Sequence, residues 1–104
     1  MIISLLAAAA LYAGVSGEPR QAYSACLKDA VANAKTTNVP ADGFKAYVHQ
    51  TCAAAEDSFR KSLAAFNVKN GMGRKVATED AQVQIDDYVF TAEDNYRFSL
   101  QASK

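Results

Sequence analysis

Hydrophobic residues recur at helical spacing in three segments of the chain, and two sets of helix-breaking residues separate these segments. The middle segment, about 41–69, has the longest regular pattern, because its apolar residues follow one another at intervals of three or four. This spacing places them on one face of an α-helix. The residues of this face are Phe44, Val48, Cys52, Ala55, Phe59, Leu63 and Phe66. Pro40 and Asp42 favour the start of this helix, and Asn70-Gly71 favours its end.

The segments on either side show shorter patterns of the same kind. The first predicted helix covers about 19–35 and ends at Thr36-Thr37-Asn38. The third covers about 79–100, with Thr78 as its expected N-cap. Residues 83–85 and 88–90 within this segment also fit short strands. Its length and its content of Ala, Glu and Asp favour a helix instead.

The first 17 residues differ from the rest, since they hold no charged side chain and residues 2–15 form one uninterrupted apolar run. A membrane-spanning helix needs about 20 apolar residues, so this run matches the central part of a secretory signal peptide. Small residues near its end predict cleavage between Gly17 and Glu18. No Lys or Arg precedes the run, and the alternative is a buried N-terminal helix. That helix would require more core than this chain supplies. The sequence therefore predicts a periplasmic or secreted protein.

The two cysteines, Cys26 and Cys52, lie in the first and second predicted helices. An oxidising compartment favours a structural disulfide in a small exported chain. Facing residues of an antiparallel helical hairpin lie at equal distances from the centre of its turn. Both cysteines are equally far from residue 39, and the helix-breaking residues independently place the turn at 36–42. We therefore expect an intramolecular Cys26–Cys52 disulfide, with an intermolecular disulfide as the alternative.

These patterns predict an all-α fold: a small three-helix domain over residues 18–104, following a cleaved signal peptide at 1–17. In this domain a disulfide-linked antiparallel helical hairpin packs against a third helix. The third helix is expected to cover Phe59, Leu63 and Phe66, which the first helix is too short to reach. The whole chain is neutral, but residues 18–75 hold nine bases against five acids, and residues 76–104 hold two bases against six acids. Opposite charges thus favour docking of the third helix beside the second.

The residues that could support catalysis or metal binding are better explained as structural. His49, the only histidine, shares a helix face with Cys52, and a Cys–His pair can act as a nucleophile. The expected disulfide removes that thiol, so we expect a partly exposed histidine. The pairs Asp86-Asp87 and Glu93-Asp94 indicate a solvated face, because adjacent residues on a helix point about 100° apart. We expect no catalytic residue, no metal and no cofactor, and therefore no enzyme.

A basic stretch precedes the acidic segment, and its bases are Arg60, Lys61, Lys69, Arg74 and Lys75. Acidic residues elsewhere in the chain balance its positive charge, and the expected export removes nucleic acid as a partner. An anionic envelope component or another exported protein is the expected partner, with membrane contact only through the signal peptide before cleavage. The loop over 70–77 has two glycines and exposed charge, so we expect Asn70, Arg74 and Lys75 to form a partner-binding site.

The function expected from the sequence is a non-enzymatic macromolecule-binding module of the periplasm or cell envelope. A structural or stress-related envelope protein without a defined ligand is the alternative. Residues 52–66, CAAAEDSFRKSLAAF, are similar to part of the small exported helical lysozyme inhibitors, which also join short helices through cysteines. This similarity implies a third interpretation, an inhibitor of an exported hydrolase such as a lysozyme, and it assigns no functional residue.

Overall fold

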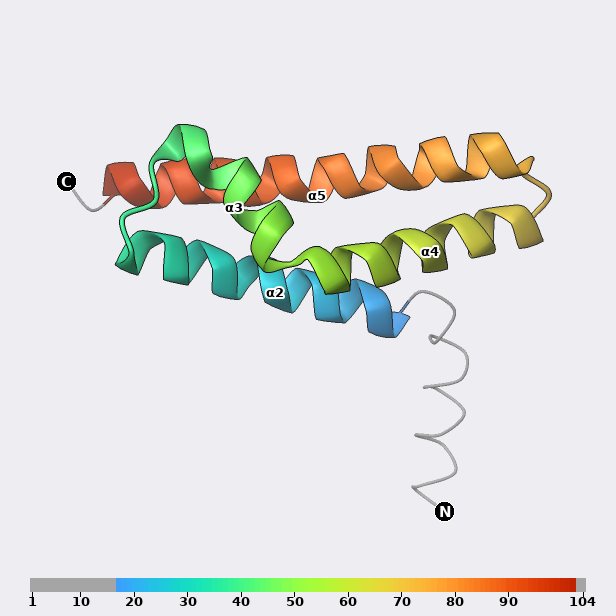
Figure 1. Ribbon diagram of the computed structural model, residues 1–104. Helices are drawn as coiled ribbons and strands as arrows, with labels where there is room; N and C mark the ends of the chain where they lie inside the picture. Colours follow the sequence, from blue (N-terminus) through green and yellow to red (C-terminus); the bar gives the residue numbers. More distant parts are fainter. Residues whose placement is uncertain (1–16, 103–104) are drawn as a thin grey trace, which may run out of the picture.

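The computed structural model describes residues 17–102, which form an all-helical fold, as expected. Its elements are α2 (Gly17–Thr36), the short 3₁₀ helix η1 (Ala41–Gly43), α3 (Phe44–Thr51), α4 (Ala53–Lys69) and α5 (Arg74–Ala102). Figure 1 shows that α2 and α5 run in the same direction, whereas α4 runs in the opposite direction and packs against both. The predicted signal peptide falls almost wholly on residues 1–16, which lie outside the described residues.

The segment expected to form one helix over 41–69 is divided at Cys52 into α3 and α4. Cys52 has φ −106° and ψ 20°, away from the helical values of about −63° and −42°. Figure 1 shows a change of direction between α3 and α4. Backbone hydrogen bonds continue on both sides, since the Cys52 N–H donates to the Val48 carbonyl and the Glu56 N–H donates to the Cys52 carbonyl, each at 2.8 Å. The bend lets α3 contact both α2 and α5 while α4 continues along α5.

The disulfide joins α2 to this bend. The sulfur atoms of Cys26 and Cys52 lie 2.05 Å apart and the two Cα atoms 5.9 Å apart, so the predicted intramolecular disulfide is confirmed. Helix α2 also contacts α4 beyond the cysteines, because the Tyr23 hydroxyl donates to Glu56. The antiparallel hairpin is therefore formed by α2 with α3 and α4 together.

The core lies where all of the helices meet, and aromatic rings occupy its two ends. Near the disulfide, the Tyr23 ring lies 5.7 Å from that of Phe59. At the other end, Phe44 stacks on Tyr96 at 4.6 Å between ring centroids. The Tyr96 hydroxyl donates to the Val39 carbonyl and so fixes the connection between α2 and α3 to α5. Ile85, Val48 and Cys52 are also fully buried.

One position of the expected apolar face on the middle segment is wrong. Phe66 is 43% exposed, and Asn67 is buried in its place. Ala55 is partly buried and packs against the core as expected, and its neighbour Glu56 is buried as well. Both polar side chains satisfy their hydrogen bonds inside the protein, and the Asn67 side-chain amide donates to the Ala77 carbonyl and to Asp80. Helix α5 thus covers Phe59 and Leu63 as expected, but it leaves Phe66 at the surface.

Helix α5 begins at Arg74, earlier than expected, because α4 ends in a compact turn. The Met72 N–H donates to the Asn67 carbonyl and the Gly71 N–H to the Val68 carbonyl, each at 3.0 Å. Gly71 has φ 99°, which glycine adopts without the steric penalty of a side chain. This turn reverses the chain within residues 70–73. Thr78 therefore lies inside α5 and does not cap it: its hydroxyl donates to the Arg74 carbonyl at 2.9 Å.

Candidate binding surfaces

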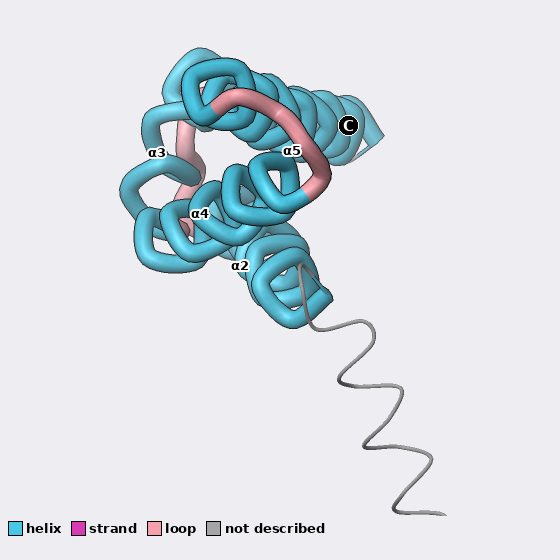
Figure 2. The backbone as a smooth tube through the Cα atoms, turned by 90° about the vertical axis from the view of Figure 1, so that its right-hand side faces the viewer, coloured by secondary structure: helices cyan, strands magenta, loops and turns pink. Residues whose placement is uncertain are grey.

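The free end of the α4–α5 hairpin, which we call the tip, consists of residues 66–76. Figure 1 shows that this end extends beyond the start of α2, and in Figure 2, viewed from that end, the loop between α4 and α5 lies in front. In the part of the chain that the structure describes, only α4 and α5 meet at the tip, and no third helix there covers its apolar side chains. Its exposed large apolar residues are Phe66, Val68, Met72 and Val76, with exposed fractions of 43, 43, 37 and 54%.

The tip also carries three cations, Lys69, Arg74 and Lys75, and no carboxylate. Among the described residues, these three cations form no ion pair, whereas Arg60 and Lys61 pair with acids of α4 itself. Arg74 and Lys75 occupy the first turn of α5, where the positive end of the helix dipole disfavours cations. Their charges therefore do not help this helix to form, and they remain available to an anionic partner.

A shallow hollow of about 490 Å³ opens beside the tip, between the end of α4 and the start of α5. Three cations line it, Lys61, Lys69 and Arg74, together with small or apolar side chains that include Val68. Basic and apolar groups therefore face the same open space. A ligand in the hollow would therefore meet both positive charge and apolar contact area.

The three residues predicted to bind a partner have different positions in the structure. Asn70 is tied to the end of α4, because its side-chain amide donates to the Phe66 carbonyl at 2.8 Å. Arg74 and Lys75 lie exposed on helix α5 rather than on a loop, and Arg74 lines the hollow. Sequence reasoning missed Phe66, because its spacing assigned it to the core. That these residues bind a partner stays a prediction.

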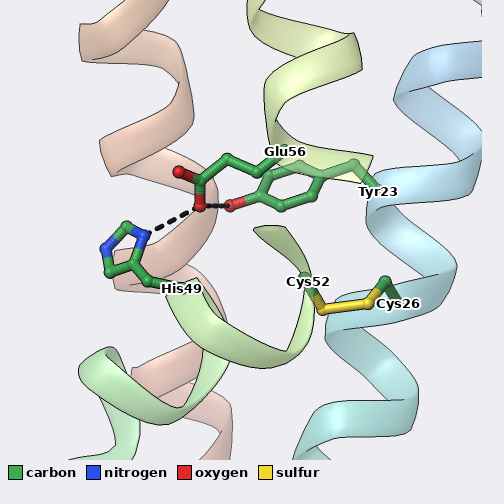
Figure 3. Close-up of a disulfide and its surroundings, with 5 residues drawn as sticks. All are labelled: Tyr23, Cys26, His49, Cys52 and Glu56. Carbon is green, nitrogen blue, oxygen red and sulfur yellow. Dashed lines mark hydrogen bonds and ion pairs between the residues drawn. A yellow bond between two sulfur atoms is a disulfide. The ribbon is translucent and has the colours of Figure 1, made fainter. Parts of the chain in front are cut away.

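A buried carboxylate beside the disulfide is the main polar cluster of the interior. Glu56 accepts hydrogen bonds from the Tyr23 hydroxyl at 3.2 Å, from His49 Nδ1 at 2.8 Å and from Arg60 at 2.6 Å. Figure 3 shows Tyr23 and His49 approaching the same carboxylate oxygen from opposite sides. Residues seven apart on a straight helix lie about 10 Å apart along its axis, so the bend at Cys52 is what brings His49 to Glu56.

This cluster has a structural role. The Arg60 Nε donates to Gln82 of α5 at 2.9 Å, so the cluster joins α2, α3, α4 and α5. Burial, the charge of Glu56 and the hydrogen bond to Glu56 raise the pKa of Tyr23 well above its ordinary value, so its hydroxyl stays a donor. His49 is partly exposed at 42% of its side chain. Because Cys52 is in the disulfide, it does not form a nucleophile pair with His49.

A second hollow, of about 510 Å³, runs between the parallel helices α2 and α5. Its lining is mostly apolar and includes Leu27, Val31 and Ala92. Its polar lining residues include Lys28 of α2 and Asp87 of α5, both of which are exposed. Charged residues of both signs line this hollow, whereas the charged residues that line the hollow beside the tip, within the described range, are all cations.

No protein-family model matches the chain, and comparisons with curated proteins and with solved structures give no significant match. Over residues 17–102, none of the helices has the length and apolar character that crossing a bilayer requires. Within the same range, no three side chains of the types His, Cys, Asp and Glu gather as a metal ion would require. The functional interpretation therefore depends on the geometry of this chain.

Proposed function

We propose that this chain is an exported, non-enzymatic binding module of the periplasm or cell envelope, and that its tip binds an anionic envelope component. The observation that carries this proposal is the tip itself, where three cations without ion-pair partners among the described residues lie beside four exposed apolar side chains. Positive charge would attract the anionic component and orient it. The apolar side chains would then add contact area as water leaves the interface.

The composition of the tip differs from that of an ordinary protein surface. Single exposed apolar residues are common on folded proteins and require no explanation. Here four of them lie within residues 66–76, together with two cations in the first turn of α5, where the helix dipole disfavours positive charge. Local features that oppose stability are expected at functional sites, where binding compensates for them. This favours a binding role for the tip.

Export is supported by the disulfide and by the uncharged apolar run over residues 2–15. Cleavage of a signal peptide predicts that the exported protein begins at Glu18, within about two residues. Mass spectrometry of the protein recovered from the exported fraction measures this directly. Recovery of chains that still begin at Met1 would contradict cleavage.

The double substitution Arg74→Ser/Lys75→Ser should leave the fold intact. Both side chains are exposed and form no ion pair with a described residue, so the free energy of unfolding should change by less than about 0.5 kcal/mol. Urea unfolding followed by circular dichroism measures this change. A loss of more than about 1 kcal/mol would show that these cations hold α5 in place, and would favour a structural role for the tip.

The same variant separates binding from folding in a co-sedimentation experiment with the isolated envelope fraction of the source cells. We expect the parent chain to sediment with the envelope and the Arg74→Ser/Lys75→Ser variant to remain largely in the supernatant. The control variant Lys35→Ser/Lys45→Ser removes two exposed cations from α2 and α3, so it has the same net charge and an unaltered tip. Equal sedimentation of all three proteins would exclude the tip as the binding site.

A further inference from the structure

The side of α5 that faces away from the core has a repeating apolar pattern. Val76, Val83 and Phe90 are each seven residues apart, so they follow one line along the helix. Their exposed fractions are 54, 57 and 64%. The buried residues of α5, such as Ile85 and Val89, occupy the opposite side. Phe98, which is 71% exposed, lies beyond Phe90 toward the C-terminal end of the helix.

Carboxylates follow this apolar line with the same repeat. Each of its three residues is followed by one acid three positions later and by a second acid four positions later; the acids are Glu79, Asp80, Asp86, Asp87, Glu93 and Asp94. These two positions lie on either side of the line on the helix surface. We call the three apolar residues with these six acids the outer stripe. Residues 76–94 contain no Lys or Arg.

Contacts within the protein leave part of this negative charge unneutralised. Asp80 and Asp86 accept hydrogen bonds from neutral amide side chains, and Glu93 pairs with Arg97 at 3.6 Å. Asp87 and Asp94 form no ion pair with any residue of the described range. The outer stripe is therefore an exposed apolar line between two rows of carboxylates.

We propose that the outer stripe docks a basic amphipathic helix of a partner protein. The partner's apolar side chains would lie along Val76, Val83 and Phe90, and its Lys or Arg residues would face the flanking carboxylates. The negative charge of the outer stripe favours a basic helix over a second copy of the chain or a bilayer. Pairing α5 with α5 of a second copy would place carboxylates opposite carboxylates, and an anionic bilayer would repel the outer stripe in the same way. The outer stripe shares Val76 with the tip but is opposite to it in charge, and its other residues lie outside the tip, so the inference does not rest on the proposed function of the tip.

The length of the outer stripe sets the length of the probe. From Val76 to Phe90 the helix rises by about 21 Å, which is about four turns of a partner helix. A suitable probe is a synthetic capped peptide of about 15 residues, with leucines along one helix face and lysines on both sides of that face. A peptide of the same composition in scrambled order, without a single apolar face, is its control. Calorimetric titration of each peptide into the mature full chain measures the affinity.

We expect the amphipathic peptide to bind one to one, and the variant Val83→Ser/Phe90→Ser to weaken its affinity at least about tenfold. This variant keeps every charge and changes only exposed side chains, so circular dichroism should show an unaltered fold. The variant Phe66→Ser/Val68→Ser is the matched control, because it removes the same residue types from the tip. It should bind the peptide as the parent does.

Two results would overturn the inference. Equal affinity for the scrambled peptide, or for the Val83→Ser/Phe90→Ser variant, would show that charge attraction alone accounts for binding. Sedimentation velocity of the parent chain without peptide tests whether a second copy of the chain binds this face instead. A dimer that forms with rising protein concentration, and that is lost in the Val83→Ser/Phe90→Ser variant, would assign the outer stripe to a second copy.

Discussion

Replacing both cysteines, as Cys26→Ala/Cys52→Ala, should lower the free energy of unfolding by about 3.5 kcal/mol. The disulfide closes a loop between residues separated by 26 positions, and removing it restores the conformational freedom of the unfolded chain. Alanine is the appropriate replacement because Cys52 is buried, at 1% exposure, and a serine hydroxyl there would require a hydrogen-bond partner. Urea unfolding of the two proteins under the same conditions measures the difference.

The reduced parent protein provides the control for this substitution. With both thiols free, its stability should approach that of the double alanine variant, because the two proteins then differ only in small side chains. Reductant should lower the free energy of unfolding of the parent protein and leave that of the double alanine variant unchanged. A difference of less than about 1 kcal/mol between oxidised and reduced parent would show that helix packing alone fixes the bend at Cys52.

Replacing Glu56 by alanine is expected to destabilise the protein by about 2–3 kcal/mol. The substitution removes the acceptor for the buried Tyr23 hydroxyl and also the partner of Arg60. This expected loss of stability is smaller than the loss from breaking a fully buried ion pair, because Arg60 and His49 retain contact with solvent. Glu93→Ala is the matched control, since Glu93 pairs with Arg97 four residues later but does not link several helices. Its loss should be below about 1 kcal/mol.

The titration of Tyr23 gives a second measure of the same contact. Glu56 contributes to raising the pKa of Tyr23, through its charge and its hydrogen bond, so Glu56→Ala should lower that pKa toward the ordinary value of about 10. A raised pKa in the folded state stabilises the protein below about pH 10, and this contribution is lost as the pH rises further. Spectrophotometric titration of the tyrosines detects the shift. An unchanged titration curve in Glu56→Ala would contradict the contact between the two side chains.

Apolar spacing was sufficient to predict the all-helical fold and the position of the disulfide, because both depend on which residues share a helix face. The bend at Cys52 could not be predicted in this way, since the apolar spacing continues through it without interruption. The burial of Glu56 was missed for a related reason. A carboxylate is normally assigned to the surface, and only the three-dimensional arrangement shows the donors that satisfy it here.

The tip was predicted only in part. Its cations were evident from the sequence, but the glycines near them indicated a longer loop than the structure contains. The exposure of Phe66 depends on how far α4 and α5 extend beyond α2, which no local pattern records. The exposure of Val83 and Phe90 could not be predicted from the sequence either, because it depends on which side of α5 packs against the core.

The salt dependence of binding tests most directly whether the cations of the tip bind an anionic envelope component. Affinity for the envelope fraction would be measured at increasing sodium chloride concentration, for the parent chain and for Arg74→Ser/Lys75→Ser. Because salt screens exposed charges, the parent should bind tightly at low salt and lose affinity steeply as the salt concentration rises. The variant should bind more weakly at low salt and change less with salt. Coinciding curves for the two proteins would contradict a binding role for the tip.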